Sequence, residues 1–173
     1  MTEPKIRLPL RYVPKNLSKK DKQKQLNMLL KSRRLYKKQK YYTRKRVNSY
    51  KNKPSKHVAN ARKIYAIQNI RPSKELALKT GCSLNSLNQI VKKGEGAYFS
   101  SGSRPNQTAQ SWGIARLASA LTAGKAAAVD YKIISEGCDH KKKAFIMANK
   151  AKKKYNDGHS SAKKTPKAAK QPK

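Results

Sequence analysis

Apolar residues recur at three- and four-residue spacing in several segments of the chain, and this period predicts helices. The longest nearly uncharged run covers residues 94–124 and predicts a loop that leads into a core helix beginning at Pro105. Gly124 follows that helix at the position of a left-handed C-terminal cap. The expected core face of this helix comprises Trp112, Ala115, Leu117, Ala118 and Leu121.

Serine or aspartate precedes three further helical patterns at the position of an N-terminal cap. These helices are expected over residues 19–40 after Ser18, 57–67 after Ser55 and 140–156 after Asp139. Another helix should continue from Gly124 to a terminator at Gly137. The first helix carries a narrow stripe of Leu26, Leu29, Leu30, Arg33 and Tyr36. Before it, prolines at positions 4, 9 and 14 predict an extended or polyproline segment.

Residues 71–94 have the pattern of a helix-turn-helix corner, with Gly81 in the turn and Gly94 at the end of the second helix. Ser73 and Ser83 are the expected caps of its two helices. A DNA-reading corner would offer Asn and Gln side chains of the second helix to adenine in the major groove. The alternative is a structural corner, because the exposed residues at the helix start are polar and not basic. The candidate base-reading residues are Asn85, Asn88 and Gln89, with Ser86 on the same helix.

Charge divides the chain into three parts. The 43 Lys and Arg residues face only eight Asp and Glu, which gives a net charge of +35. Residues 1–74 carry +22, residues 75–138 carry +3 and residues 139–173 carry +10. We therefore expect an all-α protein with a small helical domain and basic, extended arms. The expected parts are a basic N-terminal arm with one amphipathic helix (1–55), a helical core domain (56–155) and a disordered Lys/Ala/Pro tail (156–173).

The charge of the N-terminal part exceeds what solubility requires and indicates a polyanionic partner. Tyr41, Tyr42 and Tyr50 interleave with the cations of residues 37–56. Aromatic rings among cations suit nucleic acid, since rings stack on bases while cations bind phosphates. Packing of the same tyrosines against the core is the alternative. The candidate polyanion-binding residues are Lys37, Lys38, Lys40, Arg44, Lys45, Arg46, Lys51, Lys53, Lys152, Lys153 and Lys154.

The segment from Tyr98 to Thr108 is the candidate specific site. Its glycine, flanked by serines, favours a nest of backbone N–H groups, and its arginine supplies a planar fork for phosphate or carboxylate. These candidate anion-binding residues are Ser101, Gly102, Ser103 and Arg104. The spacing of a nucleotide-binding P-loop is absent. The alternative is a structural loop in which Arg104 pairs with a buried carboxylate such as Asp130 or Glu136.

Cysteines, histidines and acids show no spacing typical of catalysis or metal binding. Cys82 and Cys138 lack a CxxC pattern, and both are expected to be reduced, small apolar residues outside any zinc site or disulfide framework. No pair of acids and no serine lies in a catalytic context. We therefore expect no enzymatic activity, no metal, no cofactor and no small-molecule substrate.

The string YFSSGSRPNQTAQSWGIARLASALTAGKAAAVDYKII, from Tyr98 to Ile134, resembles the central block of an uncharacterised family of small basic proteins. Nucleocytoplasmic large DNA viruses of algae and protists encode that family. The likeness includes TGCSLNSLNQIVKKGEGA and YYTRKRVNSYKNKPSKHVANARKIY, and it extends from about Arg11 to Asn149. The family has no established activity and no catalytic residues to carry over. The resemblance implies an origin in a large DNA virus and a place in the particle.

Charge and resemblance together favour a non-enzymatic structural protein of the virion, a minor capsid or core component. Its cationic arms would bridge packaged nucleic acid, an anionic inner membrane surface or acidic capsid and core proteins. One alternative is a nucleic-acid-binding protein that condenses or regulates viral DNA, and another is a ribosomal-type RNA-binding protein. No apolar run is long enough to cross a bilayer, and no signal peptide opens the chain. The expected location is the virion, after a soluble stage in the host cytoplasm or nucleus.

Overall fold

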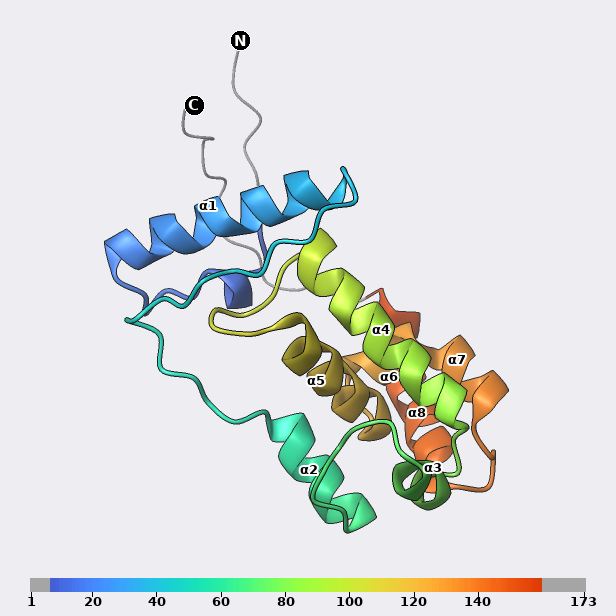
Figure 1. The fold of residues 1–173 in the computed structure, drawn as a ribbon. Coiled ribbons are helices and arrows are strands. Elements are labelled where there is room, and N and C mark those ends of the chain that lie inside the picture. Colours follow the sequence, from blue (N-terminus) through green and yellow to red (C-terminus); the bar gives the residue numbers. More distant parts are fainter. Residues whose placement is uncertain (1–6, 160–173) are drawn as a thin grey trace. The chain divides into compact units, whose positions relative to one another are not determined.

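The computed structural model describes residues 7–159, and these residues form helices and loops with no β-strand (Figure 1). The predicted all-α class is confirmed. The helices are η1 (Leu10–Tyr12), α1 (Lys19–Tyr36), α2 (Lys56–Tyr65), α3 (Lys74–Thr80), α4 (Leu84–Ser100), α5 (Ala109–Leu121), α6 (Lys125–Val129), α7 (Tyr131–Gly137), α8 (Lys143–Lys154) and η2 (Asn156–Gly158). Of the predicted disordered tail, residues 156–159 contain η2, and residues 160–173 lie outside the described residues.

The described chain divides into two compact units. The first unit consists of residues 7–52 and 99–107, and the second of residues 53–98 and 108–159. The break after Asn52 lies close to the predicted end of the N-terminal arm. The N-terminal segment, however, is not an arm by itself, because residues 99–107 of the central stretch complete its unit.

The first unit is built on α1, whose start was predicted correctly. The Ser18 hydroxyl accepts a hydrogen bond from the Asp21 backbone N–H at 3.1 Å, as an N-terminal cap does. The preceding segment is not simply extended, since it contains η1 and buries three apolar side chains. The buried apolar residues of the unit are Leu8, Tyr12, Leu17, Met28, Leu29 and Val47.

The buried stripe of α1 differs from the predicted one. Gln25, Met28, Leu29 and Ser32 are buried, whereas Leu26 and Leu30 are half-buried and Tyr36 is exposed. The helix also ends at Tyr36 and not at residue 40. Polar Gln25 is buried because its side-chain amide donates to the Tyr12 carbonyl at 3.1 Å. Leu29 of the predicted stripe is thus buried, and Gln25, Met28 and Ser32 make up the rest of the buried face.

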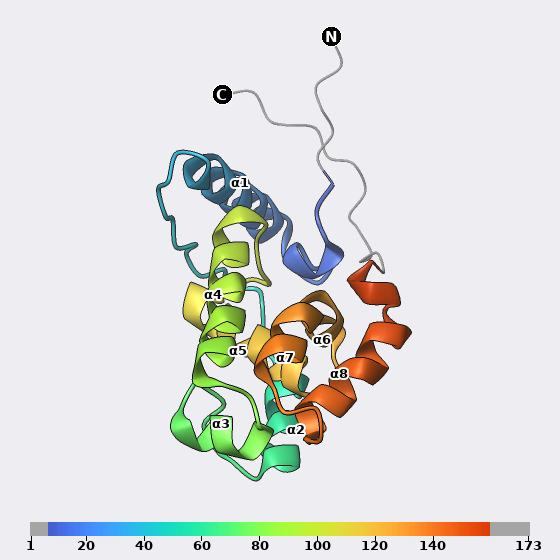
Figure 2. The same ribbon diagram turned by 90° about the vertical axis from the view of Figure 1, so that its right-hand side faces the viewer.

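The second unit packs seven helices around one apolar core. Helix α2 packs on α5, α5 on α6, and α6 on α8 (Figures 1 and 2). The predicted caps Ser55 and Ser73 accept hydrogen bonds from backbone N–H groups three residues on. The largest fully buried side chains of this core are Leu76, Leu87, Ile90, Leu117, Leu121 and Ile134.

The predicted corner is present as α3 and α4, but Gly94 does not end the second helix. Helix α4 continues to Ser100, so the predicted loop from Tyr98 is shorter. A Cβ at Gly94 would lie 2.6 Å from the Cα of Gly113 in α5. The glycine is therefore needed for close approach of two helix backbones, and not for a cap.

The helix predicted from Pro105 begins instead at Ala109. Thr108 caps it, and the side chains of Thr108 and Ser111 form a reciprocal capping box. At the other end, Ala123 takes the left-handed conformation (φ 56°), while Gly124 is extended. The predicted face is partly confirmed, since Leu117, Ala118 and Leu121 are buried, whereas Trp112 and Ala115 are half-buried.

The last helices differ from the predicted pair in their boundaries. The pattern predicted as one helix to Gly137 is broken at Asp130 into α6 and α7. Helix α8 begins after Lys142, and no side chain caps it. The predicted cap Asp139 accepts a hydrogen bond from the Lys141 N–H, so it holds the preceding turn.

Cys82 and Cys138 form a disulfide bond, so the prediction that both are reduced is wrong. Their Cα atoms are 3.8 Å apart, and the neighbouring backbones pair in antiparallel fashion. Ser83 N–H donates to Gly137 O, and Asp139 N–H donates to Gly81 O, both at 2.7 Å. This pairing brings together two residues that are 56 positions apart and carry no CxxC signal.

Candidate functional site

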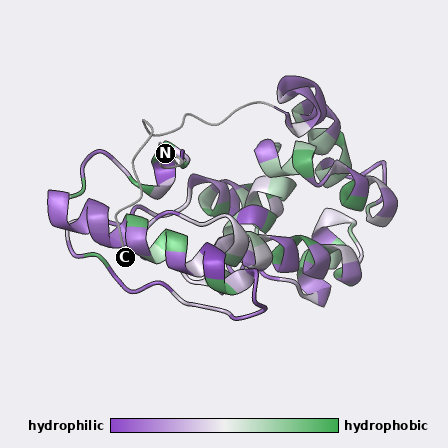
Figure 3. Cartoon of the chain, turned by 90° about the horizontal axis from the view of Figure 1, so that it is seen from above, coloured by the Kyte–Doolittle hydropathy of each residue, from purple (hydrophilic) through white to green (hydrophobic). Residues whose placement is uncertain are grey.

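The first unit carries an excess of exposed cations. Its residues 7–52 and 99–107 include 18 Lys and Arg but only one carboxylate, Asp21. Fifteen of those 18 side chains are exposed. Figure 3 shows hydrophilic residues along much of the ribbon, with hydrophobic residues interspersed in the helices. We call these 15 exposed residues of the first unit the cationic surface.

Asp21, the one carboxylate among the described residues of the first unit, forms hydrogen bonds inside that unit. Its Oδ2 atom accepts hydrogen bonds from the Ser49 hydroxyl at 2.6 Å and the Ser49 backbone N–H at 2.8 Å. These hydrogen bonds, together with the nearby Lys24 and Lys20, lower the pKa of the Asp21 carboxyl below its ordinary value. The carboxylate thus ties the start of α1 to the segment around Ser49.

Ten of the eleven candidate polyanion-binding residues are exposed. In the first unit they are Lys37, Lys38, Lys40, Lys45, Arg46 and Lys51, and in the second they are Lys53, Lys152, Lys153 and Lys154. Two of the α8 lysines have partners in their own unit. The Lys152 ammonium lies 3.8 Å from Asp157 and 4.6 Å from the ring centre of Tyr131, and that of Lys154 lies 5.3 Å from the ring centre of Tyr155.

Arg44 is the exception, since it is only 7% exposed. Its guanidinium donates to the Ser32 hydroxyl at 3.0 Å and to the Ser103 hydroxyl at 2.8 Å. Ser32 in turn donates to Phe99 O, and Ser103 donates to Arg104 O. Arg44 therefore joins α1 to the 99–107 segment inside the unit, and we withdraw it from the polyanion-binding group.

The candidate anion loop is largely engaged by the unit's own arginines. Arg33 donates from Nε and Nη2 to the Ser101 carbonyl at 2.9 and 2.6 Å, and burial lowers the pKa of this arginine. Gly102 (φ 127°) and Ser103 are buried, and a Cβ at Gly102 would lie 2.7 Å from a methyl carbon of Leu29. Arg104 alone of the four combines an exposed position with a charged side chain.

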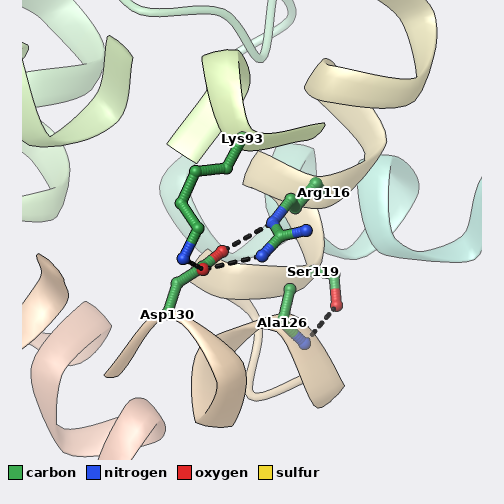
Figure 4. Close-up of polar contacts among 5 residues, drawn as sticks. All are labelled: Lys93, Arg116, Ser119, Ala126 and Asp130. Atoms are coloured by element: carbon green, nitrogen blue, oxygen red, sulfur yellow. Dashed lines mark hydrogen bonds and ion pairs between the residues drawn. The ribbon is translucent and has the colours of Figure 1, made fainter. Parts of the chain in front are cut away.

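The two carboxylates considered as alternative partners of Arg104, Asp130 and Glu136, each have partners within the second unit. The side chain of Asp130 is fully buried and accepts two hydrogen bonds from Arg116, at 2.7 and 2.8 Å. It also forms an ion pair with Lys93, in which Nζ and Oδ1 are 2.8 Å apart (Figure 4). Glu136 is exposed and lies 4.0 Å from Lys132. The buried carboxylate thus joins α4, α5 and the break between α6 and α7.

Asn106 is a structural residue that the sequence did not single out. It adopts a left-handed conformation (φ 61°), and its amide pairs with the backbone of Val47, accepting from the N–H at 2.8 Å and donating to the carbonyl at 3.1 Å. It also donates to the side chain of Asn52 at 3.1 Å. The order Pro105-Asn106 is the local signal that could have found it, since proline favours the first central position of a turn and asparagine tolerates the left-handed conformation at the second.

The candidate base-reading residues lie on the outer face of α4. Asn85, Asn88 and Gln89 are exposed, whereas Ser86 is buried and accepts from the Ser83 hydroxyl at 2.8 Å. Ser86 therefore does not share the exposed face of these three residues. The turn before this face is fixed by the backbone pairing of residues 81–83 with 137–139 and by the disulfide bond.

The three tyrosines of the basic segment divide between the two predicted roles. Tyr42 and Tyr50 are half-buried against Leu17, Met28 and Val47. Tyr41 is 70% exposed. Only Tyr41 thus keeps its ring on the surface for a partner.

A family of unknown function (DUF5824) matches residues 9–142, about three quarters of the chain. The chain belongs to this family. No curated protein and no solved structure gives a match. The DUF5824 region includes most of both units, with all residues of the cationic surface except Arg7, the Arg44 hydrogen bonds, the α3–α4 corner and both cysteines. Lys152, Lys153 and Lys154 lie beyond it.

Within residues 7–159 of this DUF5824 member, no three His, Cys, Asp or Glu side chains group as a metal site would require. In the same range no helix has the length and apolar character needed to cross a membrane.

Proposed function

We propose that this protein is a non-enzymatic structural component of a large DNA virus particle, which bridges anionic partners through its exposed lysine and arginine side chains. The observation that carries the proposal is the cationic surface, in a unit where 18 cations accompany one carboxylate. That carboxylate is already hydrogen-bonded to Ser49. The charge therefore has to be balanced from outside the unit.

The physical reason for a polyanionic partner is self-repulsion. Exposed charges interact over about 10 Å at 0.1 M salt, so 15 cations on 55 residues repel one another within a Debye length. A polyanion removes this repulsion and releases its condensed counterions on binding. Phosphates of packaged nucleic acid, an anionic membrane surface and acidic capsid proteins all meet this requirement. The viral origin is supported by the resemblance of residues 98–134 to large DNA virus proteins.

The salt dependence of DNA binding tests the charge-based part of this proposal. If about six to ten phosphates are contacted, affinity for random-sequence duplex DNA should fall by roughly 10³ to 10⁵ between about 50 and 200 mM salt. A Lys37→Gln, Lys38→Gln, Lys40→Gln variant should flatten the slope by up to about three phosphate contacts. An Asn85→Ala, Asn88→Ala variant, which removes no charge, is the matched control and should keep the slope. Absence of binding at about 50 mM salt would remove nucleic acid from the partners.

Mass spectrometry of gradient-purified particles tests the structural role. A shell component should occur in a fixed ratio to the major capsid protein and remain after the nucleic acid core is removed. A protein that condenses DNA should leave with the core and scale with genome length. Absence from purified particles would overturn the particle assignment while leaving polyanion binding intact.

A nucleic-acid-binding protein that regulates or condenses viral DNA is the second candidate, and the exposed amide face of α4 favours it. Asn and Gln side chains form paired hydrogen bonds with adenine in the major groove. A regulatory protein that reads bases through Asn85, Asn88 and Gln89 should discriminate strongly between duplex sequences and show a shallow salt slope. Replacing Asn88 and Gln89 with alanine should then abolish the discrimination, whereas a phosphate-binding surface would not respond.

A further inference from the structure

The first unit carries an exposed aromatic cluster beside its lysines. The ring centres of Tyr36 and Tyr41 are 6.1 Å apart, and those of Tyr41 and Phe99 are 5.1 Å apart, both in edge-to-face geometry. Tyr41 is 70% exposed and Tyr36 is 36% exposed, while Phe99 is half-buried. Three rings from the end of α1, the following turn and the end of α4 thus form one surface feature.

The backbone between the two tyrosines is held by hydrogen bonds. The N–H groups of Lys38 and Lys40 both donate to the Leu35 carbonyl at 2.9 Å, and Gln39 takes the left-handed conformation (φ 56°). Gln39 N–H donates to the Tyr36 carbonyl at 2.9 Å. The ring of Tyr41 is therefore presented by a defined turn, which lowers the entropy lost when a ligand binds.

Cations accompany the rings. Lys37, Lys38 and Lys40 lie between the two tyrosines in the sequence, and all three are exposed. Exposed rings alternating with lysines are the composition of surfaces that bind single-stranded nucleic acid, in which bases stack on rings while phosphates meet ammonium groups. In a duplex the base faces already stack on one another, so they are not available to these rings and stacking would add little to duplex binding.

A lipid surface fits this patch less well. Interfacial membrane binding requires a broad apolar face of residues such as Trp, Phe and Leu. Among the described residues of the first unit, the exposed large hydrophobic side chains are the two tyrosines, with no exposed aliphatic residue beside them. Tyrosine hydroxyls keep the rim of the cluster polar.

We propose that Tyr36, Tyr41 and Phe99 form a stacking platform for the bases of single-stranded nucleic acid, with the adjacent phosphates bound by Lys37, Lys38 and Lys40. This assignment rests on the proposed function, in which the cationic surface meets nucleic-acid phosphates. It adds a preference for unpaired strands that charge alone does not produce. Sequence preference is not expected, because every base has a flat face.

Fluorescence anisotropy with a labelled single-stranded DNA 20-mer and the matched duplex tests the platform on the full-length protein. Tyr41→Ala should weaken single-strand binding by about tenfold or more and leave duplex binding within about twofold. Its salt slope should match that of the wild type, since no cation is removed. Tyr41→Phe keeps the ring and should retain single-strand affinity.

Two further variants serve as controls. Lys38→Ala should weaken binding to both strands and flatten both slopes by about one phosphate contact. Leu78→Ala removes an apolar side chain that is 80% exposed in the second unit, and it should change neither affinity. Far-UV circular dichroism should show that Tyr41→Ala is folded, because the side chain is mostly outside the core.

The outcomes separate the two proposals. Wild-type protein that binds neither DNA at low salt overturns the platform and removes nucleic acid from the partners, while membrane and acidic-protein partners of the proposed function stay open to test. A second outcome is steep, salt-dependent binding of the wild type whose affinity Tyr41→Ala lowers equally for single strand and duplex, or does not lower at all. This outcome overturns the platform and leaves phosphate binding by the cationic surface in place. Phosphatidylcholine–phosphatidylserine vesicles provide the last arm: if Tyr41→Ala reduces vesicle binding but not single-strand binding, the rings serve a lipid surface and the platform assignment is wrong.

Discussion

Asp130 joins three elements of the second unit at a single buried carboxylate. Its side chain is fully buried, that of Arg116 is 20% exposed and that of Lys93 is 48% exposed. The two Arg116 hydrogen bonds lie in a low-dielectric environment and hold a fixed geometry, whereas water solvates Lys93. The two cations therefore contribute unequally to stability.

Replacing Asp130 with alanine should destabilise the protein by about 3 kcal/mol or more, because the mostly buried guanidinium of Arg116 loses its counter-charge. Lys93→Ala should lower the free energy of unfolding by no more than about 1 kcal/mol, since Asp130 keeps Arg116. Urea denaturation followed by circular dichroism measures both. Glu136→Ala, in an exposed pair, is the control, and a loss for Lys93→Ala that equals that of Asp130→Ala would contradict this account.

Single residues were predictable where their role is local. Ser18, Ser55 and Ser73 cap helices through a backbone N–H three residues on, a signal contained within one turn. Arg44 and Asn106 were misjudged or missed, because their partners Ser103 and Val47 are 59 positions away. A charged residue in a basic run gives no local sign that its neighbours in space are serine hydroxyls.

At the scale of elements, periodicity predicted the all-α class and the α3–α4 corner, whereas helix ends were less predictable. Glycine is common at helix ends. Gly94 and Gly113, however, both lie inside helices, at the point where the backbones of α4 and α5 meet. The corner itself has a feature that no spacing indicated, the disulfide bond from Cys82 to Cys138. It holds the turn before the amide face of α4 against the turn before α8.

Removing this disulfide bond should destabilise the second unit without unfolding α3 or α4. The bond closes a loop of 56 residues' separation, for which the chain-entropy estimate is about 4 kcal/mol and measured losses are typically about 2 to 4 kcal/mol. Thermal melts of the wild type with and without reductant should therefore differ. A Cys82→Ala, Cys138→Ala variant should melt like the reduced wild type and should not respond to reductant; equal melting of all samples would contradict a stabilising bond.

At the scale of the whole molecule, the first unit is assembled from two separated stretches of chain. Residues 7–52 supply α1 and most cations, and residues 99–107 supply the hydrogen-bonding groups that Arg33, Arg44 and Val47 use. The predicted arm, residues 1–55, ends within a few residues of Asn52, whereas the charge map changes only after residue 74. Neither division included the second stretch, because a nearly neutral loop gives no sign of belonging to a basic unit.

Cutting the chain between Asn52 and Lys53 should leave the two fragments associated. A protease recognition sequence inserted there allows cleavage of the folded protein, and size-exclusion chromatography in native buffer should show a single species. The contacts of Arg44 with Ser103 and of Val47 with Asn106 hold the fragments together. The same cut in an Arg44→Ala, Asn106→Ala background should release the N-terminal fragment, and release from the unmodified background would mean that this segment is an independent arm.

The discontinuous first unit also sets an order of events during synthesis. A ribosome that has made Asn52 must add about 55 more residues before Gln107 completes the unit. At about 5 to 20 residues per second, this takes roughly 3 to 10 s. The most recently added residues are still inside the ribosome, so the N-terminal cations emerge progressively during that interval, before Ser103 is available to Arg44. A phosphate of a nearby nucleic acid can therefore bind the guanidinium of Arg44 before Ser103 becomes available to it.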